Sequence, residues 1–261
     1  MRILICDDAS AALSELQKAV SAFFENREEH PELEPFIFVF ANVFPEIPVL
    51  AVFLVLAGDI PFFHEGMETT LIRTTRRKWL LGQVTVVFLL TVFWLLFFLL
   101  CSLCIFGRDL LSLDHQWSSL GKLLARTGDG TKVGFGLSAQ PSMDLVQGRK
   151  PLEALSLTVL LNGMQYTCIG MWCLALNLWT RRSYGSLLLV VFWILRRFGA
   201  GFGTVGKALN DLNPIGLTKL GSWNVQPQAA WRLAGIYVLE TVLLWLFSSI
   251  RIRRLDMTKL G

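Results

Sequence analysis

The chain has 261 residues, a formal net charge of +4 and a mean hydropathy of +0.52. Hydrophobic residues make up 53% of it and charged residues 17%, whereas soluble domains carry about 25% charged residues. This shortage of charge excludes a soluble enzyme. It indicates an integral membrane protein whose partners include the lipid bilayer and no nucleic acid.

Residues 1–35 are predicted to form a short leader. An apolar run at 2–6 has the character of a strand, Asp7 and Asp8 follow it, and apolar residues then recur at helical spacing. Residues 1–30 therefore resemble the opening of a bacterial response-regulator receiver domain of the LytTR type, and the resemblance implies that the acidic pair helps to bind magnesium. Asp59 has the position of a phosphoacceptor, but the strands that would complete a receiver sheet do not follow it. We interpret the leader as a receiver fragment joined to a foreign gene; an incidental helix-bearing segment is the alternative.

Residues 36–261 are predicted to form a membrane domain with five spans. A helix needs roughly 20 apolar residues to cross a hydrocarbon core of about 30 Å. The segment 79–106 contains no charged side chain, and a helix that is apolar on every face is typical of a membrane span. The other predicted spans cover 36–58, 154–179, 184–205 and 230–250.

Two of these spans are interrupted. Pro45, Glu46 and Pro48 make the first span the weakest of the five, and Arg196 and Arg197 lie within the fourth. The fold class expected from the whole pattern is all-α. It is a polytopic bundle of about five transmembrane helices, preceded by a short receiver-like βα leader.

Basic side chains follow the first, third and fifth predicted spans. The three clusters are Arg73, Arg76, Arg77 and Lys78; Arg181 and Arg182; and Arg251, Arg253, Arg254 and Lys259. Because cytoplasmic loops collect Lys and Arg, we expect these connections and the C-terminus in the cytoplasm. The long connection 107–153 and the acidic leader are then expected outside. Residues 110–124 are predicted to form an amphipathic helix at the membrane interface, carrying Trp117.

Polar residues inside the spans are candidates for function. Glu240 lies near the middle of the last span, where a carboxylate is expensive and normally faces a partner or water. It either lines a transport path or pairs with a polar group on a neighbouring helix. Asn162, Gln165 and Asn177 in the third span allow the same two interpretations, and contacts between helices are the more common role of such residues.

Catalytic, cofactor and metal sites are not expected. The chain has no P-loop, and its three histidines are scattered over leader and loops. The pair Cys101 and Cys104 lacks the second pair of ligands that a zinc site requires. We therefore expect a protein that is not an enzyme and that carries no cofactor.

Three stretches relate the membrane domain to a known family. They are GDIPFFHEGMETTLIRTTRRKWLLGQ at 58–83, the long connection after the next span, and NDLNPIG at 210–216. From about residue 44 onward the chain resembles the permease subunits of bacterial type-two ATP-binding-cassette exporters. The family's usual first span is missing, and the leader stands in its place.

This resemblance implies a multi-pass subunit of the bacterial cell membrane that works with a separate ATPase and with a second permease copy or paralogue. The loop 59–78 would carry the element that docks on the ATPase, with Phe62, Phe63, His64, Glu65 and Glu68 as its contact residues. The basic cluster Arg73, Arg76, Arg77 and Lys78 is interpreted as a topology signal that also contacts anionic headgroups. A membrane sensor of a two-component pathway and a non-functional fusion are the alternatives. The substrate and the direction of transport stay open.

Overall fold

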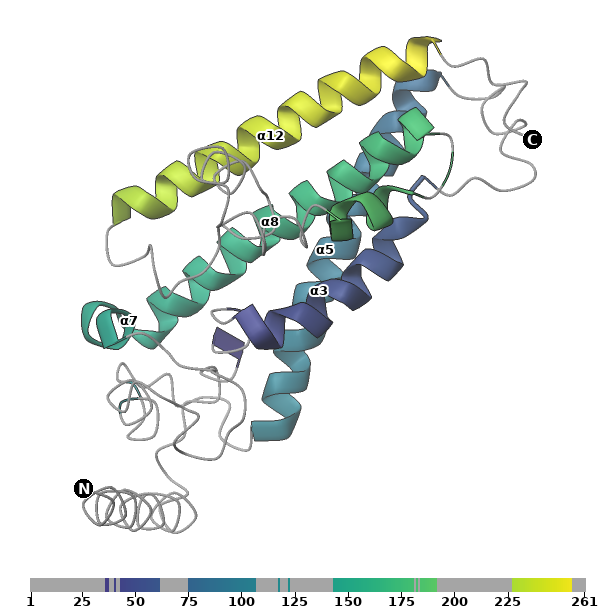
Figure 1. The fold of residues 1–261 in the computed structure, drawn as a ribbon. Coiled ribbons are helices and arrows are strands. Elements are labelled where there is room, and N and C mark those ends of the chain that lie inside the picture. Colours follow the sequence, from purple (N-terminus) through teal and green to yellow (C-terminus); the bar gives the residue numbers. More distant parts are fainter. Residues whose placement is uncertain are drawn as a thin grey trace, which may run out of the picture. The chain divides into compact units, whose positions relative to one another are not determined.

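A computed structural model of the protein describes residues 36–37, 40, 43–61, 75–106, 117, 122, 143–180, 182, 184–191 and 227–254. Most of these residues are helical, and none of them forms a strand. The helices are α3 (Val43–Gly58), α5 (Arg76–Phe106), α7 (Met143–Gly148), α8 (Pro151–Thr180) and α12 (Pro227–Arg254), and residues 185–191 are also helical (Figure 1).

Three of the described helices are long and apolar enough to cross a membrane, and this corrects the expected count of five. They cover Arg76–Cys104, Pro151–Thr180 and Ala230–Arg253. The first predicted span, 36–58, is not among them, because the apolar helix described within it, Pro48–Gly58, is too short. At 1.5 Å per residue it measures about 16 Å, roughly half of a hydrocarbon core.

The other parts of the expected fold class fall largely beyond the described residues. Of the fourth predicted span, 184–205, only residues 184–191 are described. The receiver-like leader of residues 1–35 lies outside the described part of the chain altogether. The fold that the structure supports is therefore a helical one with three candidate spans.

The chain packs as two compact units, of which the first comprises Met1–Glu46, Phe98–Thr158 and Leu220–Val225. Its described core contains Ile37, Trp117 and Ala154. The Trp117 side chain is only 4% exposed, and its Nε1 donates a hydrogen bond of 2.7 Å to the carbonyl of Arg149. This hydrogen bond satisfies the indole N–H of a buried ring. The amphipathic helix predicted at 110–124 lies outside the described residues except for Trp117 and Lys122.

The second unit comprises Ile47–Phe97, Val159–Lys219 and Gln226–Gly261. In it α5 and α8 pack antiparallel through two glycines of α8. A Cβ atom on Gly170 would lie 2.6 Å from Val87 Cγ1, and one on Gly163 would lie 3.4 Å from Leu95 Cδ1. Small residues of this kind let two membrane helices approach closely.

Helices α8 and α12 run in the same direction within this unit. Cys168 of α8 contacts Glu240 of α12, and eleven residues further along each helix Trp179 lies against Arg251. The rings of Trp179 and Phe247 stack between these two contacts, with centroids 4.5 Å apart. Helix α12 therefore begins at the end of the unit opposite to the one where α8 ends.

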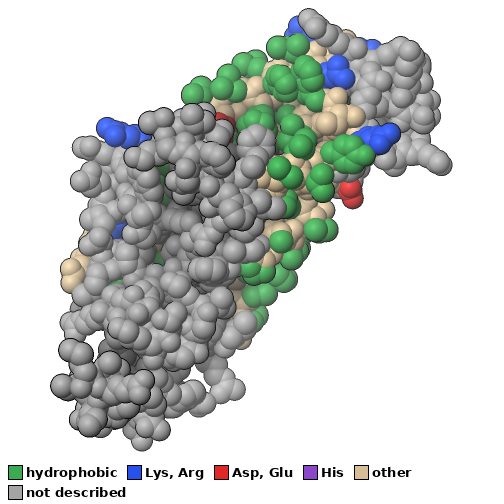
Figure 2. Space-filling model, viewed as in Figure 1, with side chains coloured by type: hydrophobic (Ala, Val, Ile, Leu, Met, Phe, Trp, Pro, Cys, Tyr) green, Lys and Arg blue, Asp and Glu red, His purple; other side chains and the backbone are tan. Residues whose placement is uncertain are grey.

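Hydrophobic and polar side chains are distributed as in a membrane protein. In the apolar, membrane-spanning stretch of each helix, 61% of the residues of α8 are buried, but only 22% of those of α5 and 28% of those of α12. Figure 2 shows hydrophobic side chains over much of the described surface. The exposed hydrophobic residues of α5 and α12 include Leu89, Phe93, Leu239 and Leu243. The buried polar side chains of the candidate spans are Thr91, Ser102, Thr158, Asn162, Gln165, Asn177 and Ser248. This inversion of the soluble pattern agrees with a location in a bilayer.

Candidate functional site

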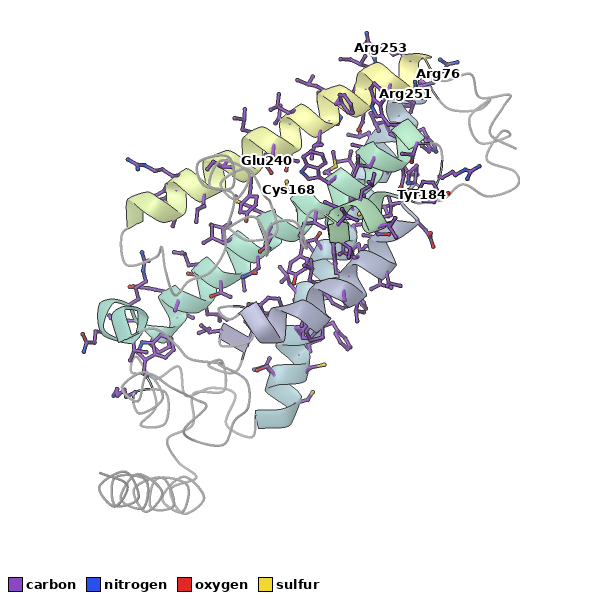
Figure 3. All side chains as sticks on the ribbon, viewed as in Figure 1. Arg76, Cys168, Tyr184, Glu240, Arg251 and Arg253 are labelled. Carbon is purple, nitrogen blue, oxygen red and sulfur yellow. The ribbon has the colours of Figure 1, made fainter. Side chains whose placement is uncertain are left out.

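Arginines join the ends of three helices at one end of the second unit (Figure 3). Arg76 Nη1, at the start of α5, donates to the carbonyl of Arg253 near the end of α12 at 2.8 Å. The Arg251 guanidinium donates to the carbonyls of Leu178 and Trp179 at 3.5 and 3.4 Å and lies 4.9 Å from the centre of the Trp179 ring. The last carbonyls of a helix have no partner within it, and its C-terminus attracts positive charge. These contacts therefore stabilise the helix ends as well as joining them.

We call this region the basic end; its described members are Arg76, Arg77, Lys78, Arg182, Arg251 and Arg253. All three basic clusters of the sequence contribute to it, although Arg73 lies outside the described residues. Arg182 follows the end of α8 and donates to the Tyr184 hydroxyl at 3.0 Å. This hydrogen bond raises the pKa of Arg182, so its charge is retained. The role of the cluster in setting topology stays a prediction.

One buried side chain, Asn177 of α8, holds two other segments at this end. Its Nδ2 donates to the carbonyls of Gly58 and Ile60, each at 2.7 Å. Its Oδ1 accepts a hydrogen bond of 2.6 Å from the backbone N–H of Gly185. The end of α3 and the start of the helical residues 185–191 are thus both attached to α8. We call this group the Asn177 joint.

The two glycines of the Asn177 joint allow the close approach that these hydrogen bonds require. A Cβ atom on Gly58 would lie 2.9 Å from Ser186 Oγ, and one on Gly185 would lie 2.8 Å from the carbonyl oxygen of Cys173. The sequence marks Asn177 only as a polar residue in a span. Its two partners are distant in the chain, so nothing in the sequence pairs them with it.

The expected docking residues Phe62, Phe63, His64, Glu65 and Glu68 lie outside the described residues. The residues on either side of this connection, at the end of α3 and the start of α5, are described. Ile60 is held by Asn177, and Arg76 is held by the carbonyl of Arg253. Both ends of the connection between α3 and α5 are therefore fixed at the basic end.

Glu240 is half-buried on α12 and has a partner on α8. Cys168 Sγ donates a hydrogen bond of 3.1 Å to Glu240 Oε2 (Figure 3). Glu240 lies eight residues after Arg232 and eleven before Arg251, which places it about 12 and 16 Å from them along the helix. It is thus near the middle of a hydrocarbon core of about 30 Å.

The thiol does not compensate for a charge at this depth. A carboxylate near the centre of a membrane helix costs roughly 2.5–3.5 kcal/mol on insertion scales. Interhelical hydrogen bonds in membrane proteins contribute about 0.6 kcal/mol on average, and a thiol is a weak donor. The contact between Cys168 and Glu240 therefore leaves most of the cost in place.

Asn162 and Gln165 are fully buried on α8. Gln165 precedes Cys168 by three residues, so the two side chains lie on the same side of the helix. Asn162 is three residues earlier still. Whether these two amides serve a transport path or helix association stays a prediction.

The described residues include no group of three or more His, Cys, Asp or Glu side chains placed to hold a metal ion. Cys101, Cys104, Cys168 and Cys173 are free thiols. No protein-family model matches the chain, and no curated protein or solved structure matches it either.

Proposed function

We propose that the chain is the non-catalytic, membrane-spanning permease subunit of a bacterial exporter, driven by a separate ATP-binding-cassette ATPase. One observation carries the proposal: both ends of the connection between α3 and α5 are held at the basic end. This connection contains the residues that the family resemblance assigns to ATPase docking.

The basic end supports a cytoplasmic position for this connection. Described members of three Lys- and Arg-rich segments gather there, and such segments collect on the cytoplasmic side of a membrane. An ATPase is a cytoplasmic partner, so it would meet the connection on the same side. The C-terminus follows Arg253 and would be cytoplasmic as well.

Because both ends of the connection between α3 and α5 are attached to other helices, a movement of the ATPase would be transmitted through the connection to those helices. Asn177 attaches the α3 flank to α8, and Arg76 attaches the α5 flank to α12. A displacement of the connection therefore reaches the ends of all three candidate spans. A pore subunit that responds to ATP hydrolysis needs such a link.

A second permease chain completes the proposed assembly. In the membrane-spanning stretches of α5 and α12 only 22% and 28% of the residues are buried. The described helices therefore do not enclose a translocation path between them. A second copy of this chain or a paralogue would supply the helices that close the translocation path. The remaining exposed hydrophobic surface would face lipid.

Site-directed photo-crosslinking in inverted membrane vesicles tests the proposal. The crosslinking amino acid p-benzoylphenylalanine replaces Phe62 in one variant and Trp231, which is 73% exposed near the start of α12, in the control. We expect the Phe62 variant to crosslink to a P-loop ATPase identified by mass spectrometry, and the Trp231 variant not to. Equal yields at the two positions, or no P-loop protein at Phe62, would contradict the proposal.

Charge reversal then tests coupling. The double variant Glu65→Lys, Glu68→Lys should separate ATP hydrolysis by the reconstituted complex from transport, because docking needs the acidic face of the loop. Glu153→Lys, an exposed position at the start of α8, is the control and should leave coupling unchanged. Normal transport in the double variant would exclude these two residues from coupling.

A further inference from the structure

The charge of Glu240 has no counter-ion among the described membrane helices. Residues 79–106, 154–180 and 233–250 contain no Lys, Arg or His, and neither does α3. The nearest basic positions on α12 are Arg232 and Arg251, both several turns away. On α8, Cys168 donates a hydrogen bond to the carboxylate, and Trp172 is a further neighbour of it. A carboxylate at this depth is normally neutralised by a partner, and the helices that the structure describes do not supply a cationic one.

The surroundings of Glu240 favour an organic cation over a metal ion. Hard metal ions take six or more oxygen ligands, and the described residues hold no group of three potential metal ligands. A delocalised organic cation needs only one carboxylate together with aromatic faces. Trp172 lies beside the Glu240 carboxylate, one turn beyond Cys168 on the same side of α8. Tyr237, one turn before Glu240 on α12, is fully buried.

We propose that Glu240, between α8 and α12, is the anionic element of a binding site for a lipophilic organic cation, and that cations of this class are the transported substrate. The carboxylate supplies the charge, Trp172 supplies an aromatic surface, and Gln165 and Cys168 supply polar groups on the facing side of α8. The naming of a substrate class rests on the proposed permease function. The binding site itself does not, because it is made by residues of this chain alone.

Binding of tetraphenylphosphonium to the full chain in lipid nanodiscs tests the site. Empty nanodiscs give the membrane-partition baseline, and tetraphenylborate, an anion of the same shape, gives the charge control. We expect saturable binding of the cation that the anion does not displace, at least tenfold weaker in Glu240→Gln. The matched control Glu153→Gln, at an exposed position, should bind like wild type. Binding no better than the baseline, equal binding of the anion, or equal binding by Glu240→Gln would overturn the proposal.

A second measurement uses the unaltered chain and so does not depend on the folding of a variant. Dicyclohexylcarbodiimide modifies carboxyl groups within membranes, and mass spectrometry locates the adduct. Tetraphenylphosphonium should slow modification of Glu240 at least tenfold and leave Glu153 unaffected. An unchanged rate at Glu240 would overturn the site.

The two proposals can fail separately. These binding assays contain no ATPase, so a negative result removes the cation site and leaves the permease function open. A chain that binds the cation through Glu240 but forms no crosslink to an ATPase from Phe62 would keep the site and lose the permease function.

Discussion

Replacing Asn177 by leucine should destabilise the protein more than any change at a neighbouring exposed polar residue. The Asn177 amide makes three hydrogen bonds to the backbone, two as donor to Gly58 and Ile60 and one as acceptor from Gly185. Leucine has the same number and branching of side-chain heavy atoms and no polar atom, so it removes all three. Two carbonyls and one N–H then lose their partner in a buried place.

The size of the effect follows from the number of bonds. An interhelical hydrogen bond in a membrane protein contributes about 0.6 kcal/mol on average, and protein hydrogen bonds in general contribute about 1 ± 0.5 kcal/mol. Three bonds give a loss of about 2–4 kcal/mol in the free energy of unfolding. Asn177→Asp separates the two attachments, because its carboxylate still accepts from Gly185 but repels the carbonyls of Gly58 and Ile60. We expect it to lose at least half of the same free energy.

Reversible unfolding in mixed micelles with increasing dodecyl sulfate, followed by tryptophan fluorescence, measures this free energy. Thr180→Val is the matched control: its hydroxyl, one turn beyond Asn177 in an exposed position, also bonds backbone carbonyls. The control should change stability by less than about 0.5 kcal/mol. If Asn177→Leu lies within the same limit, the Asn177 joint does not hold the helices together and the reasoning is refuted.

Two further predictions use the same helices. Gly170→Ala should destabilise by about 1–3 kcal/mol in the same assay, because its Cβ would lie 2.6 Å from Val87 Cγ1. Adding Val87→Ala should restore most of the loss, and Gly82→Ala, with no atom within 4 Å of its Cβ, should be neutral; equal effects of the two glycine changes would contradict the packing. In a chain without other cysteines, an impermeant maleimide added to inverted vesicles should label Arg253→Cys and not Trp231→Cys, because the two positions lie about 33 Å apart along α12. Labelling of both from one side would contradict a membrane crossing by α12.

Three of the predicted spans coincide with helices because length and lack of charge decide them. The uncharged segment 79–106 lies within α5, 154–179 lies within α8 and 230–250 lies within α12. Each helix begins three residues before the predicted start, α5 ends at the predicted residue, and α8 and α12 end one and four residues later. Pro151 and Pro227 begin α8 and α12, as expected for a residue that lacks a backbone N–H and favours the first helical turn.

The predicted span 36–58 is not among the candidate spans. Its described apolar helix is Pro48–Gly58, and Pro48 lies inside α3, where its missing N–H removes one hydrogen bond to the preceding turn. The apolar composition of the segment gave no measure of this helix length.

The partners of Glu240 and Asn177 could not be predicted from the sequence. Cys168 is paired with Glu240 because α8 and α12 run parallel at one particular offset. That offset depends on side-chain packing, such as the stack of Trp179 on Phe247, and no periodicity in either segment encodes it. The sequence identified the polar residues in the spans, and only the packing shows which of them meet.

Helix α8 connects the two proposals physically. Its residues at the basic end hold the α3 flank of the docking connection through Asn177, and nine residues earlier Cys168 contacts Glu240. These positions are about 14 Å apart on one continuous helix, and a helix transmits axial displacement and rotation with little deformation. A pull on the connection would therefore move Cys168 against Glu240 and change the surroundings of a bound cation. In this connection the α3 flank is attached to α8 by a single side chain, that of Asn177. Asn177→Asp should therefore weaken the coupling of ATP hydrolysis to transport, while cation binding to the isolated chain stays unchanged.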